Sequence, residues 1–230
     1  MRALLADLRR AAEAGARIVV TLNLPEDESF LAGAGPGLLV LRNTSPLGFG
    51  ANHNQAFRHI GGADRFVVLN PDIRCDASVF KDLLSAADAP DAGVCAPCVL
   101  SREGLIEDSA RRHPSLSRVL HRVLRRMRGQ RTTPDYQLDG DQPIVVDWAA
   151  GMFMMFPSQV FAEVGGFDER YFMYLEDADI CRRVSMLRRP TRVLPWIEVV
   201  HDARRATSRS LKHFRWHVAS MARYLWRFRR

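Results

Sequence analysis

The sequence predicts one α/β domain with a mostly parallel β-sheet flanked by helices. Nearly continuous apolar and β-branched runs recur along the chain, as is typical of strands buried on both faces of a sheet. Segments with helical periodicity separate these runs, and strands that alternate with helices favour a parallel sheet covered on both faces. A chain of 230 residues that is 47% hydrophobic is long enough to build one full-sized core.

The first half of the chain begins with a helix and then alternates between strands and helices. An amphipathic helix is expected over 2–14, where leucines recur at helical spacing before Gly15. Further helices are expected over 52–60 and in the segment that ends at Ala87. Buried strands are predicted at four places: 17–23, 38–42, 65–70 and 93–100.

The second half of the chain contains a basic segment, two more strands and an acidic helix start. The segment 111–140 has little strand signal, so we expect a helical and loop insertion. A helix over 158–164 ends at a pair of glycines, and a polar helix begins near Glu176. The α/β domain is expected to span 1–203. Its last two strands with a clear signal are 144–148 and 152–156.

The charge balance predicts an anionic partner. The chain has 33 Lys and Arg against 26 Asp and Glu, a formal net charge of +7 and an isoelectric point near 9.8. Nucleic acid, a phosphorylated substrate or acidic lipid would each satisfy this charge. We do not expect nucleic acid, because the basic residues belong to no recognition motif and the acids over 176–179 would repel phosphate without a metal.

Residues 204–230 form a separate basic tail without any Asp or Glu. Six of its apolar residues recur at intervals of three and four: Leu211, Phe214, Val218, Met221, Leu225 and Phe228. This pattern predicts an amphipathic basic helix at the C-terminus. Two roles remain open: the helix caps the domain core, or residues 209–230 lie in the plane of an anionic membrane surface.

Cysteine usage and hydropathy bear on the location of the protein. Cys95 and Cys98 have the spacing of a zinc or redox half-site, but no second pair accompanies them. We therefore interpret the four cysteines as reduced, packed thiols. No apolar run approaches the roughly 20 residues that cross a bilayer, so we expect a cytoplasmic protein that can be peripheral on the inner face of the cell membrane.

An amide and a carboxylate follow the predicted strand over 65–70. Asn70 and Asp72 flank Pro71, and side chains two residues apart point the same way from an extended strand end. Such a pair can hold Mg²⁺ or Mn²⁺ against a diphosphate and neutralise charge on a leaving group. The tripeptide is also an ordinary turn sequence, which is the alternative interpretation.

Three acids cluster where a helix is expected to begin. Glu176, Asp177 and Asp179 lie near a helix N-terminus, where the helix dipole favours negative charge, and capping accounts for one of them. The cluster suggests that at least one carboxylate faces a cleft as a general base. Further along, His201 ends an apolar segment and is either a metal ligand or a hydrogen-bonded polar residue.

In their order and spacing, these motifs resemble the signature of glycosyltransferase family 2, most closely its rhamnosyltransferase branch. The matching segments are 48–54, 69–72, 150–153, 165–169, Glu176-Asp177 and His201. Because they match together, the resemblance is more specific than any one motif. It implies a GT-A (Rossmann-like) fold and the transfer of a sugar from a nucleotide donor by a single displacement with inversion.

The resemblance assigns roles to the charged candidates. Asn70-Pro71-Asp72 stands where the family has its DXD metal motif, so Asp72 is expected to be the principal ligand of Mg²⁺ or Mn²⁺ and Asn70 a weaker one. His201 is expected to complete the metal site. Asp177 is expected to deprotonate the acceptor hydroxyl, with Glu176 beside it to position donor or acceptor.

The resemblance also assigns the substrate-binding residues. Gly48, Gly50 and Asn52 are expected to line the nucleotide-sugar pocket, together with the metal-binding pair, while Trp148 and Gly151 border the acceptor. By the same likeness, the donor would be dTDP-rhamnose. The acceptor would be a hydroxyl of a surface polysaccharide, such as an O-antigen, or of a lipid-linked glycan in a bacterium.

The family's first strand has no counterpart in this sequence. Family members usually begin with a buried strand that contacts the nucleotide base, whereas this chain begins at the helix that would follow it. The alternative to an active transferase is therefore a truncated, catalytically inactive module that binds a nucleotide sugar. Asp177 and His201 are both present, which favours catalysis.

Overall fold

The computed structural model describes residues 1–32, 37–129, 133–202 and 211–229, except for the side chains of Val123 and Arg126. The boundary predicted between domain and tail, at 203 and 204, lies outside these residues, as does the first part of the segment 209–230. The described helices are α1 (Arg2–Asp7), α2 (Arg9–Glu13), α3 (Phe49–Ile60), α4 (Ser78–Ala87), α5 (Leu116–Met127), α6 (Ser158–Glu163), α7 (Glu176–Met186) and α8 (Leu211–Arg227), with a 3₁₀ turn η1 (Ser29–Leu31).

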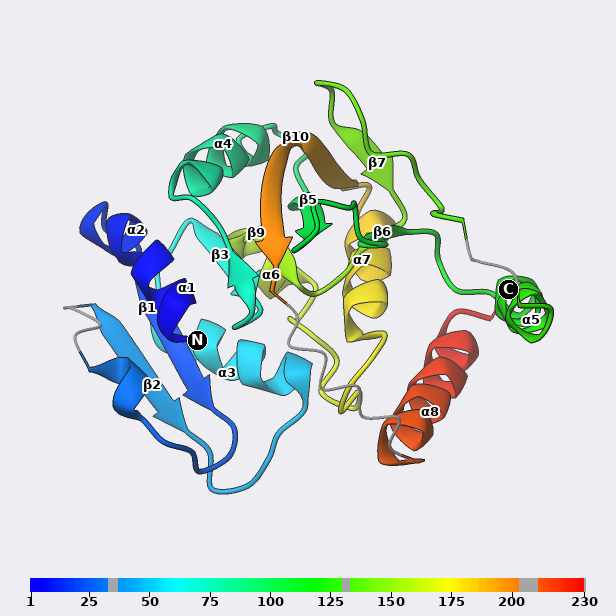
Figure 1. Cartoon of the computed structure of the whole chain (residues 1–230), viewed down its shortest axis with the longest axis horizontal. Helices are drawn as coiled ribbons and strands as arrows, with labels where there is room; N and C mark the ends of the chain where they lie inside the picture. The colour runs from blue at the N-terminus through cyan, green and yellow to red at the C-terminus, as the bar shows by residue number, and fades with distance from the viewer. Residues whose placement is uncertain (33–36, 130–132, 203–210, 230) are drawn as a thin grey trace.

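A central sheet of six strands forms the middle layer of the molecule (Figure 1). Its strand order is β3-β9-β5-β10-β4, and β7 also pairs with β10. The strands are β3 (Arg65–Leu69), β4 (Ile73–Arg74), β5 (Val94–Ser101), β7 (Ile144–Val146), β9 (Phe153–Pro157) and β10 (Thr191–His201). Since β9 is antiparallel to both β3 and β5, and β10 is parallel to β5, the strands β3, β5 and β10 run in one direction.

Two smaller sheets accompany the central one. β1 (Ile18–Leu22) and β2 (Leu38–Arg42) pair in parallel beside α1 and α2, at the left of Figure 1. β6 (Ala110–Arg111) pairs antiparallel with β8 (Trp148–Ala149). The predicted α/β class with a mostly parallel sheet and flanking helices is confirmed. β9 runs against its neighbours β3 and β5, and the short strands β4 and β7 run against β10.

Alternate side chains of the strands face two separate cores. Met154 and Phe156 of β9 pack with α6 and α7, whereas Phe153 and Met155 pack with α4 on the other face of the sheet. The helices thus cover both faces, as the near-continuous apolar runs predicted. The four cysteines are free thiols, and burial raises the pKa of Cys95 to about 11.

The structure differs from three of the predicted elements. The helix expected over 2–14 is divided at Leu8 into α1 and α2. The strand expected over 144–148 is divided between β7 and β8, because the carboxylate of Asp147 accepts the backbone N–H of His113 at 2.7 Å and the hydroxyl of Tyr136 at 3.1 Å. The helix expected over 52–60 begins earlier, at Phe49. No helix in the described ranges is long and apolar enough to span a membrane.

Candidate active site

Asp72 and His201 lie side by side because two strands meet at one end of the central sheet. β3 ends at Leu69, and the short strand β4 then pairs antiparallel with the end of β10, with Ile73 opposite His201. In this register, Nε2 of His201 lies 3.2 Å from Oδ2 of Asp72. The structure therefore brings together two of the three residues predicted to bind a metal.

Asn70 forms the turn that places Asp72. Its backbone N–H donates to the carbonyl of Met152 at 2.9 Å, and its own carbonyl accepts the N–H of Ile73 at 3.2 Å. The side chain is half-buried at the end of β3. The turn interpretation of Asn70-Pro71-Asp72 is thus correct, and it is compatible with a binding role because this turn carries Asp72 to His201.

Glu107 contacts the other nitrogen of the His201 ring. Its Oε2 atom lies 2.9 Å from Nδ1 of His201, and its backbone N–H donates to the carbonyl of Val99 at 2.8 Å. A carboxylate at one ring nitrogen fixes the orientation and tautomer of an imidazole whose other nitrogen binds a metal. Sequence reasoning missed Glu107, since it lies 94 residues from His201 and belongs to no recognised motif.

The donor atoms at this place fit part of a divalent-cation site. Oδ1 of Asp72 is buried and has no hydrogen-bond partner among the described residues. If Nδ1 of His201 donates to Glu107, Nε2 presents a lone pair toward Asp72, which a shared cation or a second ring proton would satisfy. No group of three or more His, Cys, Asp or Glu in the described ranges is arranged to hold a metal alone, so substrate or water oxygens would complete the coordination.

The acidic motif begins directly after two residues in the left-handed backbone region. The φ angle is 73° at Tyr174 and 67° at Leu175. For residues other than glycine this conformation costs on the order of 1–3 kcal/mol each and is concentrated at functional sites. The hydroxyl of Ser220 in α8 donates to the carbonyl of Met173 at 2.8 Å, which holds this loop against α8.

Asp177 accepts two backbone hydrogen bonds at the start of α7. Its Oδ2 accepts the N–H of Gly151 at 2.9 Å, and its Oδ1 accepts the N–H of Ala178 at 2.8 Å. Burial raises the pKa of Asp177, and these two bonds oppose the shift. Because Gly151 adjoins Met152, whose carbonyl binds Asn70, this segment joins the acidic motif to the end of β3.

Glu176 is buried next to this carboxylate. It is 6% exposed, its Oε2 atom has no partner in the described part of the chain, and burial followed by the charge of Asp177 raises its pKa to about 8. Two adjacent buried carboxylates disfavour a double negative charge. The two N–H bonds favour the ionised form of Asp177, so the charge of the pair resides there.

Asp179, the third acid of the cluster, has a structural partner. Its side chain is fully buried and binds Arg183 at 2.7 Å and Arg227 of α8 at 3.1 Å. An ion pair one helical turn apart within α7 accounts for this carboxylate without a substrate. Asp179 therefore belongs to the packing of α7 against α8.

Gly48 and Gly50 allow α3 to approach the loop before the acidic motif. A Cβ at Gly48 would lie 2.7 Å from the carbonyl oxygen of Tyr171, and a Cβ at Gly50 would lie 2.5 Å from Cβ of Phe167. Neither position tolerates a side chain without movement of the neighbouring atoms. The glycine-rich segment is thus needed for close packing at the start of α3.

Asn52 belongs to a chain of amides at the ends of β1 and β2. Its Oδ1 accepts from Nδ2 of Asn43 at 2.7 Å, and the same amide of Asn43 donates to Oδ1 of Asn23 at 2.9 Å. Asn23 also binds both backbone polar groups of Leu47. Sequence reasoning missed Asn23 and Asn43, although each directly follows a strand, where ligands bind in such sheets.

Trp148 is buried in the core rather than open to solvent. It is 4% exposed, and its indole N–H donates to the carbonyl of Arg112 at 3.0 Å. The guanidinium of Arg111 lies 5.2 Å from the centroid of the ring, and its charge also lowers the pKa of Asp177. Like Glu107, Arg111 is a charged residue that sequence reasoning missed, and it lies near the acidic motif.

A comparison with family models matches residues 25–160 to glycosyl transferase family 2. Among curated proteins, the chain is 32% identical over 190 residues to the N-acetylglucosaminyl-diphospho-decaprenol L-rhamnosyltransferase of Mycobacterium tuberculosis, with 76% of the chain and 62% of the relative covered. It is 33% identical over 194 residues to rhamnosyltransferase WbbL of Escherichia coli, with 79% and 71% covered. The chain thus spans about 62% of the length of the mycobacterial relative.

Solved structures show the same fold at low sequence identity. GalNAc-T7 with UDP, GalNAc and Mn²⁺ matches with a TM-score of 0.66 and 12% identity, over 91% of this chain and 41% of that one. The mannosyltransferase PcManGT of Pyrobaculum calidifontis, in complex with GDP-Man and Mn²⁺, matches with a TM-score of 0.58 and 17% identity, over 89% and 55%. These likenesses identify the fold as GT-A, as predicted.

Proposed function

The chain belongs to glycosyltransferase family 2, and from this membership we propose that it transfers a sugar from a nucleotide donor to an acceptor hydroxyl with inversion. The observation that carries the proposal is the segment over 150–152. It binds Asp177 through the N–H of Gly151 and Asn70 through the carbonyl of Met152. The proton acceptor and the turn that holds Asp72 are thereby fixed relative to each other.

In this proposal Asp177 is the general base. A sugar hydroxyl loses its proton as it attacks, and a carboxylate in a water-poor site accepts it efficiently when its pKa is raised toward the working pH. Burial moves the pKa of Asp177 in that direction. Glu176, with a pKa raised to about 8, remains largely protonated and positions a substrate hydroxyl by hydrogen bonding.

Asp72 and His201 would hold a divalent cation, with Asn70 beside them. When bound, Mg²⁺ or Mn²⁺ neutralises charge on the leaving nucleoside diphosphate. The unpartnered Oδ1 of Asp72 and the orientation of His201 by Glu107 support this assignment. The two GT-A structures with Mn²⁺ are consistent with it at the level of the fold.

We further propose rhamnose, carried by dTDP, as the donor sugar, and a lipid-linked or surface glycan as the acceptor. The support is the two rhamnosyltransferase relatives, one of which is named for a diphospho-decaprenol acceptor. Gly48, Gly50 and Asn52 would border the nucleotide, at the end of β1 and β2. Gly151 would border the acceptor next to Asp177, with Trp148 supporting it from the core.

Residues 209–230 are proposed to contact an anionic membrane surface, on its cytoplasmic side, while also closing the domain core. Tyr224 of α8 is fully buried and Ser220 nearly so, which supports the core-capping role. On another face of α8, Leu211 is 82% exposed, Phe214 66% and Val218 50%. An exposed apolar stripe among basic residues suits the interface of an anionic bilayer.

The membrane contact is tested with Leu211→Ser, Phe214→Ser and Val218→Ser combined in the full chain. These exposed positions should leave the melting temperature nearly unchanged, because surface substitutions usually shift stability by less than about 0.5 kcal/mol. Binding to anionic vesicles should fall in a flotation assay. Equal binding of variant and wild type would exclude this surface.

The transferase proposal is tested by nucleotide release from candidate sugar nucleotides, with Mn²⁺ or with EDTA. Asp177→Asn should reduce turnover on the order of 10²–10⁴-fold, the usual contribution of a general base, while the nucleotide still binds. The matched control is Asp82→Asn, at an exposed position of α4. Wild-type chain that binds a sugar nucleotide without turnover would favour the alternative, an inactive binding module.

A further inference from the structure

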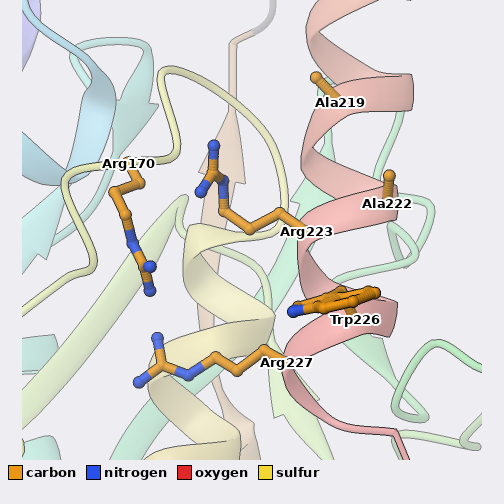
Figure 2. Close-up of a pocket in the computed structure, with 6 residues that line it drawn as sticks. All are labelled: Arg170, Ala219, Ala222, Arg223, Trp226 and Arg227. Carbon is orange, nitrogen blue, oxygen red and sulfur yellow. The ribbon is translucent and has the colours of Figure 1, made fainter.

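A cavity of about 680 Å³ opens between α8 and the loop that precedes the acidic motif. The residues that line it are Arg170, Ala219, Ala222, Arg223, Trp226 and Arg227, as Figure 2 shows. None of the residues proposed for sugar transfer lies in its wall. The two arginines of α8 extend toward Arg170, so three guanidinium groups share one side of the cavity (Figure 2).

The three arginines of the cavity outnumber the carboxylates that bind them among the described residues. Arg170 and Arg227 both bind the same carboxylate, that of Asp168, at 2.6 and 2.7 Å. Arg227 also lies 3.1 Å from Asp179, a carboxylate that it shares with Arg183. Asp168 is largely buried behind them, and its hydrogen bond from Arg170 is the main reason that its pKa is lowered to about 2. Arg223 forms no ion pair within the described residues, and its guanidinium lies 5.8 Å from the Tyr171 ring. The wall therefore retains positive charge for an anion.

The rest of the lining is apolar, lies on α8 like Arg223 and Arg227, and continues onto the exposed face of that helix. It is formed by two alanines and Trp226, whose side chain is 68% exposed. Leu211, Phe214 and Val218 are exposed further along the same helix. A ligand that fills the cavity and covers this face needs an anionic group and an apolar body.

We propose that this cavity binds the phosphate group of an anionic amphiphile at a membrane surface. Arginine forks form paired, charge-assisted hydrogen bonds with phosphate oxygens. The exposed apolar face disfavours nucleic acid, and α8 has no acidic residue with which a second copy could pair. The inference rests on the proposed membrane contact of α8, and it specifies the chemical group that α8 recognises.

The test compares Arg223→Gln with Arg215→Gln in the full chain. Both remove one positive charge from α8, but Arg215 does not line the cavity. Because Arg223 holds no carboxylate, its substitution should leave the fold intact, as a thermal melt would verify. Binding is measured to phosphatidylcholine vesicles with and without phosphatidic acid, and to inorganic pyrophosphate in solution.

We expect Arg223→Gln to weaken binding to phosphatidic acid vesicles on the order of tenfold, the effect of losing a charged hydrogen bond. Arg215→Gln should cost less, about fivefold, as expected for a charge near an anionic surface. Arg223→Lys should recover only part of the loss, because lysine keeps the charge but not the fork. Wild-type Trp226 fluorescence should shift to the blue on binding, and Trp226→Phe should remove that shift.

Three results would overturn the inference. If Arg223→Gln binds these vesicles as tightly as Arg215→Gln, the cavity does not recognise phosphate, although the membrane contact of α8 stands. If only pyrophosphate binding depends on Arg223, the ligand is a soluble phosphate and the lipid assignment is wrong. If the wild type binds no vesicles, both the inference and the membrane contact fail, while nucleotide release still tests sugar transfer independently.

Discussion

Glu107 orients His201, a role that it can have only once the chain has folded. Its contact with Nδ1 of His201 leaves Nε2 directed at Asp72. Carboxylates placed in this way orient a metal-binding imidazole, and their mutation typically costs 10–100-fold in metal affinity. The pair Asp72 and His201 therefore depends on a third side chain that does not itself need to touch the metal.

We predict that Glu107→Gln weakens Mn²⁺ binding about 10–100-fold, since the amide can accept a hydrogen bond but carries no charge. Titration with Mn²⁺, followed by its electron paramagnetic resonance signal, measures the change. Glu13→Gln, at an exposed position of α2, is the matched control. Unchanged Mn²⁺ affinity in Glu107→Gln would mean that the imidazole is oriented without it.

Glu176 should make the stability of the fold depend on pH. Its folded-state pKa of about 8 lies above its ordinary value of 4.5, because burial and the charge of Asp177 favour the protonated form. Its stabilising contribution is therefore complete below about pH 4.5 and is lost as the pH rises through about 8.

The free energy of unfolding of wild type should fall as the pH is raised from 5 to 9. We predict that in Glu176→Gln this fall is smaller, by on the order of a few kcal/mol. Urea denaturation at both pH values gives this difference. Glu13→Gln should retain the wild-type pH dependence. A Glu176→Gln profile parallel to that of wild type would show that Glu176 titrates normally in the folded protein.

Among the elements, α5 contradicts what its pattern alone suggests. Amphipathic helices usually turn their apolar stripe to the core, yet in α5 Leu116 is 73% exposed, Leu120 60% and Leu124 42%. The helix is held by its polar side, where Arg122 binds Asp135 at 2.8 Å. These three leucines therefore contribute little to the stability of the domain.

Leucine substitutions in two helices should therefore change the stability of the protein to very different extents. Leu120→Ala in α5 should change the free energy of unfolding by less than about 0.5 kcal/mol. Leu83→Ala in α4, where the side chain is fully buried, should cost roughly 2–5 kcal/mol. Chemical denaturation of both variants measures this contrast. A large loss in Leu120→Ala would indicate that α5 packs its apolar stripe in solution.

The local sequence predicted those elements whose apolar runs or helical periodicity lie within the element itself. The strand over 65–70, the helix start at Glu176 and the basic helix after Leu211 follow from runs and periodicity that neighbouring residues determine. The division of 144–148 into two strands could not be predicted in this way. It depends on Asp147 binding His113, which lies 34 residues earlier.

At the scale of the whole molecule, the candidate site could be predicted as a set of residues but not as an arrangement. Family likeness selected Asp72, His201 and Asp177, and the structure then places His201 against Asp72 through the pairing of β4 with β10. That contact joins positions 129 residues apart. Glu107 and Arg111 were missed for the same reason, since their partners are distant in sequence and near only after folding.

The strand order also determines when the sheet can form during synthesis. β3 cannot pair until β9 has been synthesised. β4, β5 and β7 all pair with β10, which is synthesised after them. Pairings between distant segments form slowly, because the entropy of closing the loop is lost before any contact compensates for it. A nascent chain released only as far as β9 would expose the edge of β5, which β10 later covers. The growing chain should therefore be most prone to aggregation just before β10 leaves the ribosome.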